Sequence, residues 1–216
     1  MLQATREKAG ALTAQPDSQP AVASAIAFQR ERRAHWDAVA ERFKGGSLGG
    51  RFYHAELAHC YCLLVPPGMR VLEVGCGQGD LLAALRPSLG VGVDLSAPMV
   101  RQASEKYPHL RFIQADAHAL DLGGPFDVIV LSDLVNDLWD VQTVLEKLTN
   151  VAEPQTRLIL NTYSRVWQLP LLVAQRLSLS RPTLVQNWLT VEDMANLLQL
   201  TGFEVIKRSR EILVPV

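Results

Sequence analysis

Short apolar segments alternate with amphipathic segments over most of the chain. The apolar segments, rich in Val, Ile and Leu, read MRVLEV, VGVDL, RFIQA, FDVIVL and RLILNTY between residues 69 and 163. The segments between them, such as DLLAALR, APMVRQASEKY and VQTVLEKLTNVAE, have the apolar spacing of helices. Strands without polar alternation are buried on both faces, as in parallel sheets covered by helical crossovers. The pattern therefore predicts an α/β fold with a doubly wound, mostly parallel sheet.

Two amphipathic segments precede this alternation and predict N-terminal helices within residues 26–66. In FQRERRAHWDAVAERF the apolar residues recur near the helical period, with charged residues between them. The glycine-rich KGGSLGG interrupts the pattern, and FYHAELAHCYCLLV then runs up to Pro66. Residues 1–25 are rich in Ala, Gln, Ser and Pro and lack the apolar stretch of a secretory signal. They are interpreted as a flexible tail.

Composition and charge exclude several classes of protein. The 48% apolar content excludes disorder for most of the chain, yet no stretch approaches the ~20 uninterrupted apolar residues of a membrane span. The 21 basic and 22 acidic residues nearly cancel, so no global charge attracts a nucleic acid. Cys60, Cys62 and Cys76 have neither disulfide nor zinc spacing. We expect a cytoplasmic protein with reduced thiols, no membrane span and no nucleic-acid partner.

A glycine-rich loop, VGCGQGD, follows the first segment of the alternation. Gly75, Gly77 and Gly79 permit a tight turn and a close approach of the backbone to a ligand at the start of the next helix. The dinucleotide-binding pattern GxGxxG would need glycine at position 80, where the chain has Asp80. A carboxylate at the helix start would repel a pyrophosphate. The loop therefore predicts a cofactor other than a dinucleotide.

Two acids follow the next two predicted strands. Asp94 lies at the offset from the glycine loop at which a carboxylate accepts both hydroxyls of a ribose. Asp116 follows the strand after that and could accept a hydrogen bond from an exocyclic adenine amine. Acids in such positions are also ordinary helix caps or turn residues. Both alternatives stay open for each acid.

The glycine loop, its preceding acid and the two later acids together resemble the class I S-adenosylmethionine-dependent methyltransferases. The resemblance covers about residues 50–210. In finer detail, the chain is similar to a bacterial small-molecule subgroup that is sometimes fused to glycosyltransferases. The segments that carry this second similarity are YHAEL, PPGMRVLEVGCGQGDLLAAL, LSDLVNDLWDVQ and QNWLT. The family resemblance implies that the loop holds the methionine end of S-adenosyl-L-methionine, that Asp94 holds the ribose, and that residues near Met99 and Asp116 hold the adenine. The cofactor-binding residues implied in this way are Glu73, Gly75, Cys76, Gly77, Gly79, Asp94, Leu95, Met99, Asp116, Ala117 and Ser132.

The end of the chain departs from that family. The family sheet normally contains a seventh, antiparallel strand between strands five and six, and only one strand-like segment, FEVIKRSREILVPV, follows the last predicted helix. Its RS pair is poor hairpin chemistry. We expect the last antiparallel strand to be missing from this chain, with a homodimer partner or a fused domain completing the sheet.

The resemblance also suggests a division of the chain. The helices of residues 26–66 would cover the active site, and residues 67–216 would form the S-adenosylmethionine-binding domain. The stretch of about 164–190 is too long for an ordinary connection and is expected to form a lid-like insertion lined by aromatic residues such as Trp167 and Trp188.

Three aspartates follow the fourth segment of the alternation, in LSDLVNDLWD. Asp140 is expected to cap the helix VQTVLEKL. In the family, residues here lie beside the transferred methyl group, so Asp137, our preferred general base, and Asp133 are candidate catalytic residues. Magnesium coordination and simple capping are the alternatives. His54, in the second helix, is a third catalytic candidate, with a structural role as its alternative.

The expected function is methyl transfer from S-adenosylmethionine to a small-molecule acceptor by in-line displacement. Holding the two reactants in line contributes much of the catalysis in such reactions, so a decisive catalytic constellation is not required. The alternatives are an RNA methyltransferase and a non-catalytic cofactor-binding or scaffold module.

Overall fold

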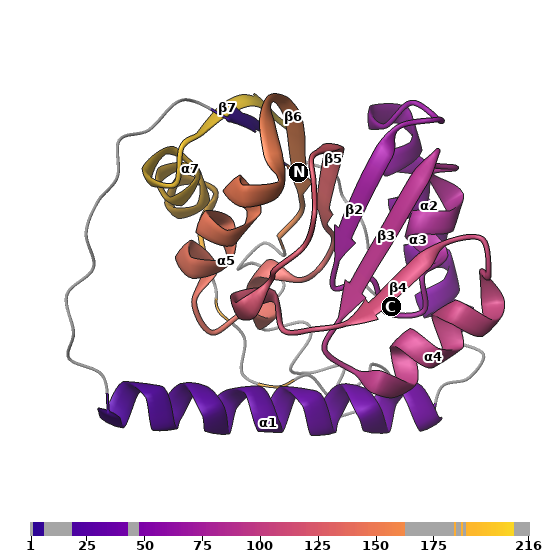
Figure 1. Ribbon diagram of the computed structural model, residues 1–216, viewed down its shortest axis with the longest axis vertical. Coiled ribbons are helices and arrows are strands. Elements are labelled where there is room, and N and C mark those ends of the chain that lie inside the picture. Colours follow the sequence, from indigo (N-terminus) through magenta and orange to yellow (C-terminus); the bar gives the residue numbers. More distant parts are fainter. Residues whose placement is uncertain are drawn as a thin grey trace.

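The computed structural model of the protein describes residues 2–6, 19–42, 48–162, 184, 187 and 189–209 (Figure 1). Within these residues, seven strands form one sheet in the order β4-β3-β2-β5-β6-β1-β7. The strands β2 to β6 pair in parallel, and β1 runs antiparallel to both of its neighbours. Their bounds are β1 Leu2–Arg6, β2 Arg70–Val74, β3 Leu89–Asp94, β4 Arg111–Gln114, β5 Phe126–Leu131, β6 Ala152–Leu160 and β7 Phe203–Arg208.

Helices cover both faces of the sheet, which confirms the predicted doubly wound α/β class. Their bounds are α1 Gln19–Arg42, α2 Leu48–Leu64, α3 Asp80–Ala84, α4 Ala97–Lys106, α5 Val141–Leu148 and α7 Val191–Leu200. One core cluster packs α5 and α7 on one face, and a second packs α2 and α3 on the other. The four residues 128–131 of β5 are all 0% exposed and contribute alternately to the two clusters. This double burial explains why the strand needs no polar alternation.

The prediction of a flexible tail over residues 1–25 is wrong for residues 2–6, which form β1. Ala4 is 1% exposed and pairs with Leu158 of β6 on one side and with Val205 of β7 on the other. The strand fills the position where the sequence had suggested a gap. The chain's own N-terminal strand, rather than a homodimer partner or a fused domain, therefore provides the antiparallel member of the sheet; residues 210–216 lie outside the described part.

The predicted N-terminal helices are confirmed as α1 and α2, but α1 begins at Gln19, earlier than residue 26. Residues 19–25 include three alanines, the strongest helix former, and Pro20 is tolerated in a first turn. Figure 1 shows α1 lying across the end of the sheet toward which β2 and β3 point. It packs on α4 through Val39, Ala40 and Met99.

Most of the predicted insertion at 164–190, including Trp167 and Trp188, lies outside the described residues. Within it, Asn187 is described, and its backbone N–H donates to Asn136 at 2.8 Å. None of the helices that the structure describes is both long and apolar enough to cross a membrane.

Candidate functional site

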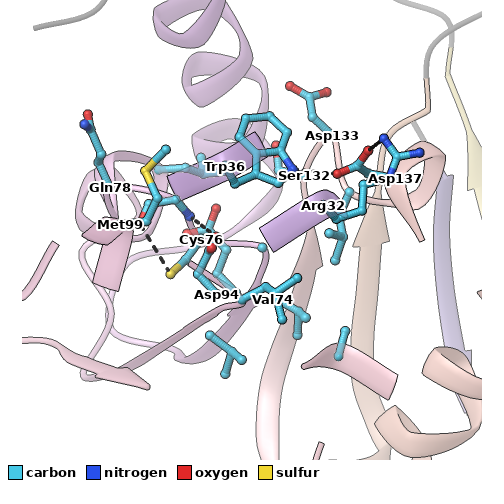
Figure 2. Close-up of a pocket in the computed structure, with 18 of the residues that line it drawn as sticks. Arg32, Trp36, Val74, Cys76, Gln78, Asp94, Met99, Ser132, Asp133 and Asp137 are labelled. Atoms are coloured by element: carbon cyan, nitrogen blue, oxygen red, sulfur yellow. Dashed lines mark hydrogen bonds and ion pairs between the residues drawn. The ribbon is translucent and has the colours of Figure 1, made fainter. Parts of the chain in front are cut away.

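A cavity of about 630 Å³ opens at the carboxyl ends of the parallel strands. It lies where β2 and β5 meet and the chain order reverses, which is the usual ligand position in open α/β sheets. Its lining comes from the segments after β2, β3, β4 and β5 and from the helices α1 and α2. In Figure 2, Gln78, Cys76 and Met99 lie on one side of this cavity, and Asp133 and Asp137 lie on the other.

The glycine loop bends sharply between β2 and α3. Gly75, Gly77 and Gly79 all have positive φ, at 77°, 51° and 78°. A Cβ on Gly79 would lie 2.6 Å from the ring of Phe112, whereas nothing lies within 4 Å of one on Gly77. Glycine is thus required at position 79 by both conformation and space, and at position 77 by conformation alone.

We expect Gly79→Ala to destabilise the protein by about 1 to 3 kcal/mol, because it combines backbone strain with a contact that must be relieved. Thermal unfolding with and without S-adenosylmethionine measures the effect. Gly123→Ala is the matched control, since nothing lies within 4 Å of a Cβ there and its φ is not in the left-handed region. Equal melting temperatures for the two variants would contradict this account of the loop.

Asp94 ends β3 and faces the glycine loop. Its Oδ2 accepts from the Gly77 backbone N–H at 2.8 Å, and its Oδ1 accepts from Ser96 N–H at 2.9 Å. Burial raises the pKa of Asp94, although these backbone donors act in the opposite direction. The carboxylate both shapes the loop and lines the cavity.

Asp116 lines the same cavity from the segment after β4. It caps the short 3-10 helix Ala117–Ala119 by accepting from His118 N–H at 2.9 Å, and it contacts His118 Nδ1 at 2.7 Å. Burial acts to raise the pKa of Asp116, but the hydrogen bonds to His118 outweigh it and lower the pKa. Asp116 therefore caps this short helix, as the capping alternative predicted, and also lies on the cavity wall. The neighbouring lining residues Leu95, Met99 and Ala117 form an apolar wall.

Glu73 lies in β2, two residues before Gly75, and has 2% of its surface exposed. Among the described residues, its Oε2 has no hydrogen-bond partner, and burial raises the pKa of this carboxyl well above its usual value. A buried oxygen without a partner is costly unless a ligand supplies a donor. Cys76, also buried, and Ser132 line the same cavity.

Asp137 is held by two side chains of α1. Its Oδ1 pairs with Arg32 Nη1 at 2.8 Å, and its Oδ2 accepts from Trp36 Nε1 at 2.6 Å. Arg32 has 4% and Asp137 12% of the side chain exposed, so the pair is largely shielded from water. These contacts fix α1 against the segment after β5 (Figure 2). Several residues of α1 line the cavity, among them Phe28, Arg32, Trp36 and Val39.

Asp133 is held from two other elements. The hydroxyl of Tyr53 in α2 donates to both of its carboxylate oxygens, at 2.9 and 3.0 Å. Asn161, directly after β6, contacts both its backbone and its carboxylate. Asp133 has φ 54°, an uncommon conformation for a residue other than glycine.

Asp140 and His54 are the remaining residues that the sequence singled out. Asp140 caps α5 as predicted, since its side chain accepts from Thr143 N–H at 3.0 Å. His54 lines the cavity but lies on an exposed position of α2, beside Tyr53. No cluster of potential metal ligands occurs among the residues that the structure describes.

Three residues of the site were not singled out by the sequence. Arg32 belongs to a charged stretch that is typical of a solvated helix face, and Trp36 fits the apolar stripe of the same helix. Asn161 follows a buried strand, and its position after that strand was the one available signal.

Comparison with known proteins identifies a family and several relatives that this chain resembles. A family model described as a methyltransferase domain matches residues 50–208. Trans-aconitate 2-methyltransferase of Azoarcus sp. (strain BH72) is 34% identical over 88 residues, which cover 39% of this chain and 35% of that protein. The biotin biosynthesis bifunctional protein BioCD of Bordetella avium is 31% identical over 137 residues, covering 60% of this chain and 30% of that protein.

Solved structures extend the likeness to the fold. The magnesium protoporphyrin IX methyltransferase ChlM of Synechocystis PCC 6803, with bound SAH, superposes with a TM-score of 0.67 over 83% of this chain and 91% of that chain, at 21% identity. This chain spans only about a third of the two curated relatives, 30% and 35% of their lengths. The family match covers well over half of the chain, which therefore belongs to the class I S-adenosylmethionine-dependent methyltransferase family.

Proposed function

We propose that the protein transfers a methyl group from S-adenosylmethionine to a small-molecule acceptor. The observation that carries this proposal is the convergence of Glu73, Asp94 and Asp116 on one cavity with the glycine loop. These three carboxyl groups come from three different strand ends, and each has the chemistry that one part of an adenosyl amino acid needs. The family and the trans-aconitate methyltransferase relative support the same reaction.

The hydrogen-bond donors of the cofactor match the carboxylate acceptors on the cavity wall. The partnerless Oε2 of Glu73 is suited to the ammonium group of the methionine part. Asp94 would accept from the ribose hydroxyls, and Asp116 from the adenine amine, with Leu95, Met99 and Ala117 against the ring. The bound cofactor supplies an activated methyl group on a positively charged sulfur.

The opposite side of the cavity would hold the acceptor. Trp36, Phe28 and Leu138 give it an apolar surface, and His54 and Asp137 add polar groups. Its size suits a compact organic molecule better than a polynucleotide, since sites of about 300 to 1,000 Å³ enclose drug-sized ligands.

Calorimetric titration with S-adenosylmethionine and S-adenosylhomocysteine tests cofactor use. We expect saturable binding of both, and no binding at about 1 mM would contradict the proposal. Transfer of tritiated methyl groups is then measured on trans-aconitate, 3,4-dihydroxybenzoate, histamine and 1,4-naphthohydroquinone, which present different acceptor atoms. Binding without transfer to any acceptor would favour the alternative of a non-catalytic module.

Asp137 is our proposed general base, and its contacts define the test. A general base contributes on the order of 100-fold, so Asp137→Asn should lower kcat by about that factor while the Kd for S-adenosylmethionine changes less than threefold. Trp36→Phe is the control, because it removes the indole donor to Oδ2 and keeps the carboxylate. Equal losses of kcat in the two variants would instead assign Asp137 to the anchoring of α1 alone.

A further inference from the structure

The turn that follows β5 contains a residue in an uncommon backbone conformation. Asp133 lies at φ 54°, in the left-handed region, although it is not a glycine. Such conformations persist where surrounding contacts fix them, and they are concentrated at functional sites. The contacts that fix Asp133 therefore indicate the function of this turn.

Asn161 holds this turn through both of its amide atoms. Its Oδ1 accepts from the backbone N–H of Asp133 at 3.1 Å, and its Nδ2 donates to Asp133 Oδ1. The hydroxyl of Tyr61, which is 0% exposed, donates to the same Oδ1 of Asn161 at 2.8 Å. Asn161 itself is fixed to the sheet by a backbone hydrogen bond to Leu131 at 3.3 Å. One side chain thus sets both the backbone and the carboxylate of Asp133.

Tyr53 fixes the other side of the Asp133 carboxylate. Its ring is buried, with 7% exposed, in the cluster that packs α2 on the sheet. Its hydroxyl lies 2.9 and 3.0 Å from the two oxygens of Asp133. Three elements, α2, β5 and β6, therefore converge on one residue, and the turn cannot shift without moving one of them.

The turn lies where the two halves of the cavity meet. Ser132, Asp133 and Leu134 all line the cavity, and Figure 2 shows Ser132 and Asp133 on the side of Asp137. Leu134 also lies against the glycine loop, since its Cδ1 is 2.9 Å from where a Cβ of Gly75 would be. A displacement of the turn would therefore change the spacing between the cofactor loop and the acceptor side.

We propose that Asn161 and Tyr53 are positioning residues for methyl transfer, an inference that rests on the proposed function. They hold the turn of residues 132–134 in the geometry that places the acceptor in line with the methyl group. A misplacement of about 1 Å costs on the order of 100-fold in rate. Neither residue makes a bond or moves a proton in the reaction. The role of Asp133 is then to be held and to shape the cavity, rather than to act as a base.

Asp133→Asn distinguishes positioning from base catalysis. Asparagine tolerates positive φ, and its side-chain oxygen can accept from Tyr53 and Asn161 as the carboxylate does. It cannot take up a proton at neutral pH. The geometry of the turn is therefore kept in this variant while a basic carboxylate is lost.

The experiment compares Asn161→Ala, Tyr53→Phe and Asp133→Asn with the wild type and with Ser104→Ala. Ser104 donates to a helix carbonyl on the exposed face of α4 and serves as the matched control for loss of a hydrogen bond. The kcat and the KM for S-adenosylmethionine are measured with the acceptor of the four-compound panel that gives the highest turnover. Amide hydrogen exchange at Asp133 is measured with S-adenosylhomocysteine bound. Tyr53→Phe keeps the test valid if Asn161→Ala fails to fold, because it removes only one hydroxyl.

We expect Asn161→Ala to lose 10- to 100-fold in kcat and Tyr53→Phe about 10-fold, with the KM for the cofactor within threefold of wild type. Amide exchange at Asp133 should become faster in Asn161→Ala, and Asp133→Asn should lose less kcat than Asn161→Ala. A kcat within threefold of wild type in both Asn161→Ala and Tyr53→Phe would overturn the inference. So would an Asp133→Asn variant as impaired as Asn161→Ala, which would make Asp133 a base. Failure of the proposed function is recognised separately, by absence of cofactor binding to the wild type.

Discussion

Replacing Asp94 with alanine should raise the Kd for S-adenosylmethionine at least about 100-fold. Hydrogen bonds to a charged group contribute about 1.5 to 3 kcal/mol each, so losing two to the ribose hydroxyls costs about 3 kcal/mol or more. The change also removes the acceptor of Gly77 N–H and Ser96 N–H, and with it the support of the glycine loop. Isothermal calorimetry at neutral pH measures the loss.

Two controls make this result specific to the site. Asp121→Ala removes an exposed carboxylate outside the cavity and should leave the Kd within threefold. Asp94→Asn keeps one acceptor oxygen and should lie between wild type and Asp94→Ala. A Kd within threefold of wild type for Asp94→Ala would separate this residue from cofactor binding.

The pH dependence of binding follows from the same carboxyl. Because burial raises the pKa of Asp94, it becomes protonated at a higher pH than an ordinary aspartate. The neutral acid must donate with one oxygen and accepts less well. The affinity of the wild type for the cofactor should therefore fall as pH decreases through that raised pKa, whereas the Asp94→Asn variant should lack this component of the fall.

Ala4→Asp should destabilise the protein more than Gly79→Ala does. Ala4 is 1% exposed in the core cluster between β6 and β7, so a carboxylate there would be buried without a partner in the sheet. Uncompensated burial of a charge costs about 3 to 5 kcal/mol, a large part of the 5 to 15 kcal/mol that stabilises a typical domain. For a chain of this size, that corresponds to a decrease in Tm of about 6 to 20 °C.

The matched control is Ala27→Asp, which makes the same substitution on the exposed face of α1. Differential scanning calorimetry of the two variants compares a buried and an exposed carboxylate directly. If Ala4→Asp lowered the Tm by less than 2 °C, residues 2–6 would not belong to the sheet in solution. Because no residue of β1 lines the cavity, a folded Ala4→Asp protein should bind S-adenosylmethionine with an unchanged Kd.

The sequence predicted those features that depend on local pattern. Strands buried on both faces carry unbroken apolar runs, so β2 to β5 and the helices between them were predicted at nearly their observed positions. The strand β6 begins at Ala152, five residues before the segment predicted for it, which was residues 157–163. The positions of Gly75 and Asp94 on the cavity wall follow from their places at the ends of two parallel strands, Gly75 directly after β2 and Asp94 as the last residue of β3. The cap at Asp140 was predicted because the sequence has an aspartate directly before an amphipathic helix.

Features that depend on pairing between distant residues were not predicted. The strand β1 has a weak local pattern, and its partners in β6 and β7 lie at the other end of the chain. Arg32 looks like a surface residue until Asp137 is placed against it. Asn161 contacts Asp133, which lies 28 residues earlier in the sequence. In each case the role of the residue is determined by a tertiary contact, whereas its neighbours in the sequence favour a different role.

The place of β1 in the sheet also has a consequence for the order of folding during synthesis. Translation proceeds at about 5 to 20 residues per second, so residues 2–6 leave the ribosome about 10 to 40 s before β7 does. Until then the edge of β1 that pairs with β7 lacks its final partner. Exposed strand edges recruit other chains, so nascent copies should depend on chaperones until the last strand has been made.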